Sequence, residues 1–434
     1  MLAAVLLADL YGAFFALIVP SRLRSPMSTV TLAAARWPAL LDSTARAFRG
    51  ELLPMRFAGR HRVLVSFAAF GLFWGAWGAS LPALQRRSGA DDGEIGIALV
   101  LVGFGALVSM RATGVLLDRV GPRLTPMTIA AFAIAGALPG LATSPAVLFA
   151  FALVLGTTSG AMDVAINTDG VREEVASGRP LLNLAHACFS VAVVGASIAT
   201  GLLRAAGGGP ILVFALTATL VTAAALLVRP LREERRPPTT RGERPRLLER
   251  VPGWLLMLGF AGALAYWIEN AWQSWSAVHL ERTLEASPAL GALGPALFAA
   301  SMAAGRLLVH RLARPGTERV VLVGGATTAA AGSALAAFAP TAPVLLVGLV
   351  VAGAGCSVCA PTLVSVAGRA APESERATLV GSLTTLMYFG FLAGPAAVGG
   401  LADATTLRTS LAGVAALGLL LAALAGVIRL PPRR

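Results

Sequence analysis

Two carboxylic acids stand in the middle of long apolar stretches, where ionisable side chains are rare. Asp163 lies in the apolar segment 146–170 and Glu269 in the segment 252–279. A charge at the centre of a bilayer costs at least ~2.5–3.5 kcal/mol on insertion scales, so neither carboxyl group is expected to face lipid. Removal from water favours the neutral form of a carboxyl group, which lets it load a proton on one side of a membrane and release it on the other. We therefore predict that Asp163 and Glu269 are proton-coupling residues, with a structural hydrogen-bonding role as the alternative.

The polar residues around these acids repeat at helical spacing. Successive residues of a helix advance by about 100°, so the face that each one occupies follows from its number. Three apolar segments each carry a single polar stripe on this basis. The residues of these stripes that we predict to bind a solute are Asn167, Asn183, His186, Tyr266, Asn270 and Gln273. For His186 the alternative is a hydrogen bond between helices.

Aromatic and basic residues in the same segments allow further roles. Trp74 and Trp77 are three residues apart in the segment 62–84 and are candidates for stacking on a solute ring. The alternative is a place in the aromatic belt at the membrane interface. Arg111 and Arg306 lie near the ends of their segments, and we expect them to extend toward the interface or to support a loop motif.

The elements that must position these residues are membrane-spanning helices. The chain has 434 residues, of which 56% are hydrophobic and 13% charged, whereas charged residues make up about a quarter of a typical soluble domain. The apolar residues come in blocks of about twenty, the length with which a helix crosses about 30 Å of hydrocarbon. The predicted spans are 62–84, 95–117, 124–143, 146–170, 181–203, 210–228, 252–279, 290–309, 320–339, 343–367, 377–400 and 408–428.

A polar run separates the first six spans from the last six. Residues 229–250 hold eight arginines, four glutamates and four prolines, a composition that cannot be embedded in lipid. We predict an N-terminal six-helix bundle at 62–228, a cytoplasmic linker at 229–250, and a C-terminal six-helix bundle with its tail at 251–434, the two bundles being parallel repeats. Residues 1–61 are either an extension with an extra helix or the result of an overcalled start codon, with translation beginning near Met55.

The distribution of the 35 basic residues, all arginine, predicts the orientation. Most lie in connections on one side of the spans, and cytoplasmic loops carry such an excess. Both ends of the twelve-helix unit are therefore expected in the cytoplasm of a bacterium, with the spans in the inner membrane. Aromatic residues are not interleaved with the arginines, which argues against nucleic acid as a partner. The sequence holds no catalytic triad, metal cluster or Walker loop, so we expect no enzyme, metal, cofactor or ATP-driven transport, and we expect a monomer.

The connection between the second and third spans carries a loop motif. It resembles the GxLxDRxGxR signature of the major facilitator superfamily, and the matching residues are Gly114, Asp118, Arg119, Gly121 and Arg123. Glycine permits a tight turn, and acidic and basic side chains at a helix end can pair with each other and with the helix terminus. The motif is therefore predicted to act in gating. The second half has a degenerate copy at 305–312, with His310 in the place of the acid.

Two further stretches resemble the fucose-permease-like branch of this superfamily. One is the run AMDVAIN at 161–167, followed by His186, and the other is ENAWQSWSAV at 269–278. The resemblance covers about residues 62–428. It implies an all-α fold of twelve membrane helices in two bundles, alternating access, and often proton-coupled uptake of a sugar or similar polar solute.

The same resemblance places Asp163 where relatives keep a fourth-helix acid. The first-helix acid of the sugar permease is absent from residues 70–84, and Glu269 is a candidate to replace it. A proton-driven exporter of a drug or metabolite is the alternative function. Such exporters usually carry a GPxxGG-like motif in the fifth helix, and the span 181–203 lacks it.

Overall fold

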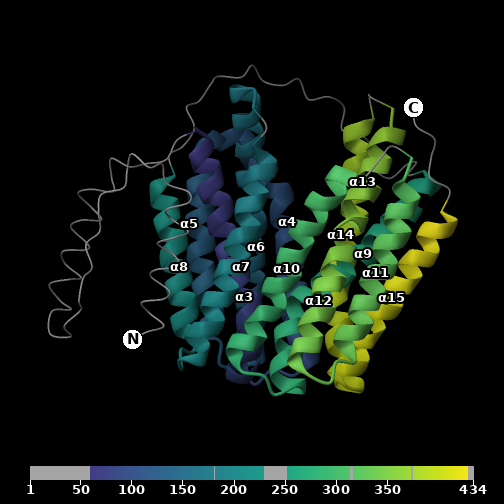
Figure 1. Cartoon of the computed structure of the whole chain (residues 1–434). Coiled ribbons are helices and arrows are strands. Elements are labelled where there is room, and N and C mark those ends of the chain that lie inside the picture. Colours follow the sequence, from purple (N-terminus) through teal and green to yellow (C-terminus); the bar gives the residue numbers. More distant parts are fainter. Residues whose placement is uncertain (1–58, 180, 229–251, 313–315, 373–374, 429–434) are drawn as a thin grey trace.

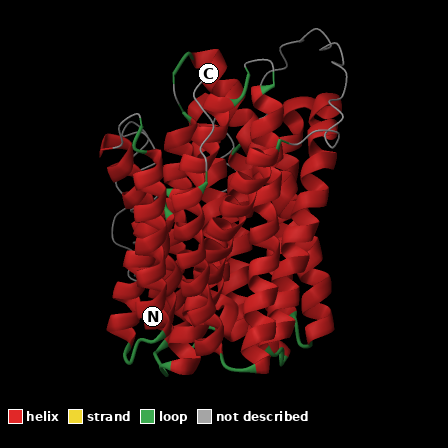
Figure 2. Ribbon diagram, turned by 90° about the vertical axis from the view of Figure 1, so that its right-hand side faces the viewer, coloured by secondary structure: helices red, strands yellow, loops and turns green. Residues whose placement is uncertain are grey.

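The computed structural model describes residues 59–179, 181–228, 252–312, 316–372 and 375–428, and within them it is all helical, without strands. The α-helices are α3 Gly59–Ser88, α4 Asp92–Val120, α5 Leu124–Ala137, α6 Pro145–Ser177, α7 Leu182–Ala205, α8 Pro210–Leu227, α9 Gly253–Val278, α10 Pro288–Leu312, α11 Glu318–Ala337, α12 Ala342–Cys356, α13 Cys359–Ala370, α14 Arg376–Ala404 and α15 Leu407–Val427. They run side by side along one axis (Figures 1 and 2). The predicted all-α class is confirmed.

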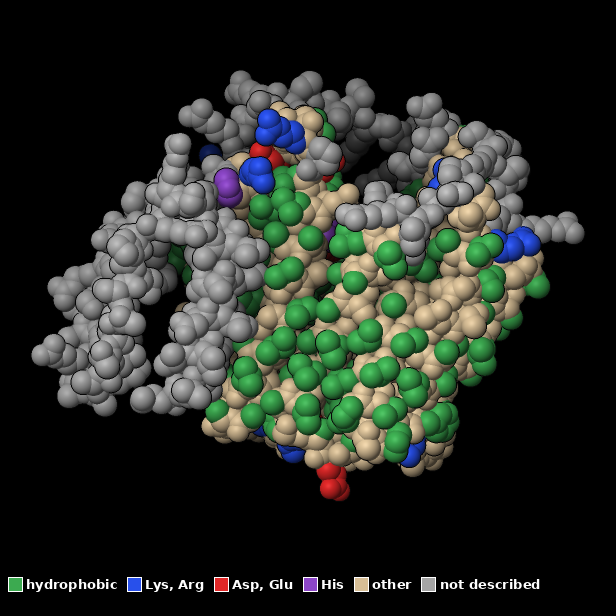
Figure 3. Space-filling model, viewed as in Figure 1, with side chains coloured by type: hydrophobic (Ala, Val, Ile, Leu, Met, Phe, Trp, Pro, Cys, Tyr) green, Lys and Arg blue, Asp and Glu red, His purple; other side chains and the backbone are tan. Residues whose placement is uncertain are grey.

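The outer surface of the bundle is apolar over its middle. Figure 3 shows hydrophobic side chains along the sides of the helices and charged ones at the two ends. Eleven helical stretches of the described chain are long and apolar enough to cross a membrane. The 26-residue helix α9 falls short of this standard because Glu269, Asn270 and Gln273 lower its hydropathy. Helix α9 lies at the predicted span 252–279.

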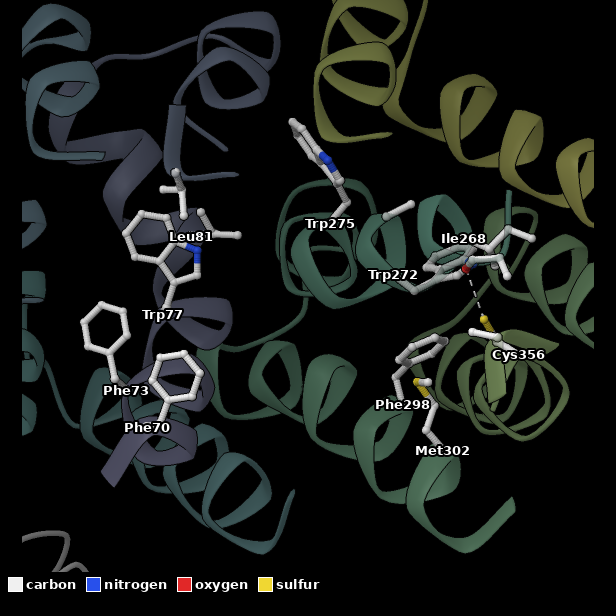
Figure 4. Packing of buried hydrophobic residues seen from close by; sticks show 14 of the residues in the cluster. Phe70, Phe73, Trp77, Leu81, Ile268, Trp272, Trp275, Phe298, Met302 and Cys356 are labelled. Carbon is white, nitrogen blue, oxygen red and sulfur yellow. Dashed lines mark hydrogen bonds between the residues drawn. The ribbon is translucent and has the colours of Figure 1, made fainter. Parts of the chain in front are cut away.

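The helices form two groups that follow the order of the chain. Helix α3 packs on α7 and α4 on α6, while α9 packs on α14 and α11 on α12. Each group has its own apolar packing, with Phe70, Phe73 and Trp77 of α3 on one side and Trp272 and Phe298 on the other (Figure 4). We call α3–α8 the N-terminal half and α9–α15 the C-terminal half.

Glycines allow the helices to approach one another closely, as small residues do in membrane proteins. A Cβ atom on Gly156 of α6 would meet the carbonyl of Val102 on α4, and one on Gly390 of α14 would meet that of Ala263 on α9. These contacts between backbones fix α6 and α9, the two helices that carry the predicted acids.

The predicted tenth span is broken into two helices. Helix α12 ends at Cys356, and α13 begins at Cys359. Pro361 has no N–H to donate to the carbonyl of residue 357, four positions earlier, so the regular hydrogen-bond ladder is interrupted there. The carbonyl of Ser357 is thereby available to another donor.

The two halves touch near one end of the bundle and diverge toward the other. Helix α4 packs on α14 and α7 on α10 across the halves. Gly201 of α7 lies against Ala292 of α10, and Gly96 of α4 lies against Pro395 of α14. We call this the closed end; it is where α3 leads into α4 and α9 leads into α10. At the opposite end, which we call the linker end because α8 ends and α9 begins there, the helices of the two halves spread apart (Figure 1).

Several predicted features lie outside the described residues. They are an extra helix before residue 59, the linker 229–250 and the side chains of Asp118 and His310. The helix boundaries otherwise differ from the predicted spans by a few residues. The first helix begins at Gly59 and continues to Ser88, beyond the predicted span of 62–84, and Arg86 in its added last turn pairs with Glu281.

Candidate functional site

Eight polar residues from both halves form what we call the central cluster. They come from α6 and α7 in the N-terminal half and from α9, α10 and α14 in the C-terminal half. They are Asp163, Asn167, His186, Tyr266, Glu269, Gln273, Arg306 and Tyr388. Six of the eight are among the residues that the sequence predicts for proton coupling or solute binding.

The carboxyl group on α6 is held by its own helix. The Asn167 side-chain amide donates a hydrogen bond of 3.0 Å to Asp163 Oδ1 and another of 2.9 Å to the Asp163 carbonyl. Because the residues are four apart on a helix, this pair forms without tertiary help. Both side chains are half-buried. Asp163 therefore keeps a second oxygen free of protein donors among the described residues.

The carboxyl group on α9 is arranged in a similar way but has a basic neighbour. Gln273 Nε2 donates to Glu269 Oε1 at 3.0 Å. Arg306 Nη2 of α10 lies 3.9 Å from Glu269 Oε2. This separation is too long for a hydrogen bond, so the two charges attract each other without being locked together.

Arg306 connects the C-terminal half to the N-terminal half. It interacts electrostatically with His186 of α7 as well as with Glu269 and Tyr266 of α9. Its Nε donates to the carbonyl of Ser357 at 3.4 Å, the carbonyl that Pro361 leaves available. The expectation that Arg306 extends toward the membrane interface is wrong, because its partners lie in the interior between α7, α9 and α12.

Tyr388 of α14 is the residue that relates the two acids to each other. It interacts electrostatically with both Asp163 and Glu269. Its ring meets that of Tyr266 at 5.8 Å and that of Phe391 at 6.1 Å between centroids. The sequence prediction missed Tyr388, although it is one of three tyrosines in the chain and stands in an otherwise apolar span.

His186 and Asn183 both lie on the exposed side of α7. The His186 ring meets the Phe67 ring edge-on at 4.9 Å and faces Arg306 electrostatically. Asn183 lies one turn before it and makes no hydrogen bond with another residue of the described chain. The structure therefore brings His186 into the central cluster and leaves Asn183 at its edge.

Three other residues predicted to bind solute are engaged in packing. Asn270 is 7% exposed and donates to the carbonyl of Phe391 on α14 at 2.7 Å. Trp77 is 4% exposed, with its ring 6.2 Å from that of Phe214. The half-buried Trp74 packs edge-on against Phe73 at 5.4 Å. These contacts support the fold, and a place in the interfacial belt does not describe Trp77.

The loop motif lies at the linker end of α4. Gly121 ends the helix with a φ of +69°, and its N–H donates to the carbonyl of Leu117, a backbone conformation that favours glycine. Arg119 and Arg123 are exposed, and a side chain on Gly114 would meet nothing within 4 Å. The motif therefore forms a helix end on the surface, and its described side chains do not belong to the central cluster.

A second group of charges joins the halves at the closed end. We call it the closing network, and it consists of Gln85, Arg86, Asp92, Arg204, Glu281, Arg282 and Asp403. Arg204 of α7 donates to both Glu281 oxygens at 2.7 and 2.8 Å, and to the carbonyl of Ala79 at 2.5 Å. The sequence signal for it is the small set of arginines on the face that is otherwise poor in them.

Two further sets of bonds in the closing network cross the halves. Arg282 pairs with both oxygens of Asp92 at the start of α4. Asp403 at the end of α14 accepts from the backbone N–H groups of Asp92 and Gly93 at 3.1 and 2.7 Å. A carboxylate at a helix N-terminus is well placed for the helix dipole. Each of these bonds must break if the closed end is to open.

Among the described residues, no group of three or more histidine, cysteine or acidic side chains is placed to hold a metal ion. The cysteines Cys188, Cys356 and Cys359 are free thiols. Cys356 packs with its sulfur 3.4 Å from the carbonyl of Ala265, which is a helix contact.

A bundle of membrane-length helices in two halves, joined at one end around polar interior residues, is an architecture that suits a membrane transporter. The sequence matches the Major Facilitator Superfamily over residues 63–342 and 276–434. The chain therefore belongs to this superfamily and is a multi-pass membrane transporter, not an enzyme. The fucose-permease-like branch within it stays a prediction.

Relatives in sequence are themselves membrane proteins of bacteria. An uncharacterised MFS-type transporter of Yersinia pestis is 32% identical over 84% of this chain and 94% of its own length. The membrane protein MosC of Rhizobium meliloti is 26% identical over 83% of this chain and 88% of its own length.

Solved structures share the fold at low sequence identity. The nucleoside transporter NupG, in the structure of a point mutant, superposes with a TM-score of 0.73 at 13% identity, over 85% of this chain and 99% of that one. A D-xylose-proton symporter gives 0.67 at 12% identity, over 86% and 97% of the two chains.

Proposed function

We propose that this protein takes up a small polar solute together with protons by alternating access, with Asp163 and Glu269 as the proton carriers. The observation that carries the proposal is that two half-buried acids, one from each half, each accept a hydrogen bond from a side-chain amide four residues further along the same helix. Both acids also act electrostatically on Tyr388 of α14, which supports a shared space between the halves where a solute and protons would be bound together. Neither acid has a full ion pair to hold it ionised, so either can gain or lose a proton as the halves move.

The orientation of the chain gives this arrangement a direction. We expect the linker end in the cytoplasm, since the loops there carry most of the arginines. The described conformation is then closed toward the outside by the closing network and open toward the inside. The solute of a symporter would leave from this state, and protons on the two acids would leave with it.

The nature of the solute is supported by the interior residues and by the names of the structural neighbours. Amide, imidazole and phenol groups line the central cluster, and they donate and accept hydrogen bonds. The neighbours NupG and the D-xylose-proton symporter are, by name, transporters of nucleosides and of a sugar. The site therefore suits a hydrophilic solute about as large as a sugar or a nucleoside.

The experiment is uptake into proteoliposomes that contain the purified protein. Uridine, D-xylose and D-glucuronate are offered with and without an imposed proton gradient, acidic outside. Gradient-driven accumulation of at least one of the three solutes, with acidification of the lumen, is the expected result. Gradient-driven exclusion would instead establish the exporter, and accumulation unaffected by the gradient would remove proton coupling.

A further inference from the structure

The central cluster contains one arginine that is only partly satisfied. An arginine side chain offers five N–H donors in a planar fork, and among the described residues Arg306 uses its Nε for the carbonyl of Ser357 at 3.4 Å. The nearest carboxylate oxygen, on Glu269, is 3.9 Å from Nη2. The Arg306 side chain is 48% exposed, and that of Glu269 is 18% exposed. The outer edge of the guanidinium is therefore available to another acceptor.

The fold holds this guanidinium in place instead of leaving it on a flexible arm. Pro361 frees the carbonyl of Ser357 at the junction of α12 and α13, and this carbonyl fixes the Nε side of the group. The Nη side then points toward Glu269 and His186, its electrostatic partners on α9 and α7. A fork held by its base is a good geometry for a planar anion, since two parallel hydrogen bonds to a carboxylate add both energy and orientation.

We infer that the transported solute carries a carboxylate, which pairs with Arg306 after Glu269 has taken up a proton. The inference rests on the proposed function and names its substrate class. When Glu269 is ionised, it competes with the solute for the same guanidinium, and the two negative charges repel each other. A proton that moves from water to the Glu269 carboxylate removes this competition, and the same proton returns to water after the solute has left.

The charges around the pair favour a solute with one negative charge. The groups that face Arg306 and Glu269 are His186 on α7, Tyr266 on α9, Cys356 on α12 and Tyr388 on α14, and Asp163 on α6 also faces Tyr388. None of these except His186 can supply a second positive charge. A solute with two negative charges would leave one unbalanced beside two acids, which is costly where water is scarce.

The neutral part of the solute is expected to be flat or ring-shaped. Tyr266, Tyr388 and Phe391 form an aromatic corner beside Glu269, with centroids 5.8 to 6.4 Å apart. Aromatic surfaces of this kind bind sugar rings and aromatic bodies through their faces. Sugar acids and small aromatic acids both meet the requirement.

The test compares three carboxylates with their neutral amides, so that shape is constant and charge changes. The probes are D-glucuronate and D-glucuronamide, nicotinate and nicotinamide, and phenylacetate and phenylacetamide. Each is titrated against the purified protein at pH 6 and pH 8, and the rise in melting temperature gives the apparent Kd. We expect at least one carboxylate to bind about tenfold more tightly than its amide, a difference of about 1.4 kcal/mol, and to bind better at pH 6.

Two variants test the roles of the pair. Arg306→Gln should remove the preference for the carboxylate and leave amide binding unchanged. Glu269→Gln should make carboxylate binding nearly equal at pH 6 and pH 8, because the competing charge is gone. Arg111→Gln is the matched control, since Arg111 is an exposed arginine of α4 that lies outside the central cluster.

The outcomes separate this inference from the proposed function. Equal binding of every carboxylate and its amide, or no shift with any carboxylate, overturns the inference. A preference that survives in Arg306→Gln overturns it as well. If an amide is instead accumulated by proteoliposomes in response to a proton gradient, proton-coupled uptake stands and the carboxylate requirement falls.

Discussion

The closing network and the central cluster both place charges between the halves, but they pair them differently. In the closing network, Arg204 and Glu281 form two bonds of 2.7 and 2.8 Å, with side chains 3% and 4% exposed. In the central cluster, Arg306 and Glu269 are 3.9 Å apart and 48% and 18% exposed. A buried, hydrogen-bonded ion pair stabilises one conformation. A partly exposed pair without a hydrogen bond leaves both charges able to bind other partners. The comparison separates residues that hold the two halves together from residues that we propose carry protons and bind the solute.

The largest effect is expected at Asp163, which has no basic partner within the described part of the chain. Asp163→Asn keeps the hydrogen-bonding shape but cannot carry a proton, so proton-driven solute accumulation in proteoliposomes should fall to the level of empty liposomes. Expression and melting temperature should be preserved. Normal flux with an unchanged pH profile would mean that Asp163 has a structural role, and Glu269 would then be the one remaining candidate of the two for proton coupling.

The next largest effect is expected when the closing network is broken. Glu281→Gln leaves Arg204 without its carboxylate, and breaking one side of a buried ion pair costs about 3–5 kcal/mol. Opening of the closed end hydrates Arg204 and relieves this cost, so the population of the outward-open state should rise about tenfold or more. Spin labels placed at the closed ends of α7 and α10 would report it as a longer distance.

The control for that experiment lies within one half of the protein. Glu318 of α11 accepts from Arg369 of α13 at 2.9 Å, and both residues belong to the C-terminal half. Glu318→Gln removes the ion pair with Arg369, which lies within one half. The label distance between the halves should therefore stay unchanged. Equal shifts in Glu281→Gln and Glu318→Gln would mean that charge loss alone, and not its position, controls the conformation.

A smaller effect distinguishes two neighbouring amides on α9. Asn270→Ala removes the hydrogen bond to α14, which for a buried bond in a membrane protein is worth about 0.6 kcal/mol, so the melting temperature should fall slightly while solute affinity is kept. Gln273→Ala should do the reverse, because Gln273 contacts only Glu269 in the central cluster. If instead Asn270→Ala lowered the solute affinity and Gln273→Ala lowered the melting temperature, Asn270 would be a binding residue and Gln273 a structural one.

Much of the fold follows from local features of the sequence. Apolar blocks of about twenty residues define the spans, and Gly121 of the loop motif ends a helix, as a glycine at a tight turn is expected to. Among the described spans, only α9 is too polar to be recognised as a membrane span by hydropathy alone. The reason is its polar stripe, which includes Glu269 and Gln273 of the central cluster. The helical stripe correctly relates Asp163 to Asn167 and Glu269 to Gln273, since neighbours four residues apart depend on helix geometry alone.

The sequence by itself determined the membrane class, the two halves, the superfamily motif and the faces that carry the acids, because each depends on composition or on residues close in the chain. Only the tertiary structure decided which residues from different helices meet. It joined Arg306 to Glu269, His186 and the carbonyl of Ser357, and it related Asp163 to Glu269 through Tyr388. It also withdrew Asn270 and Trp77 into packing. Helical periodicity fixes the direction of a side chain around its own axis, but the partner across the halves depends on how the helices pack.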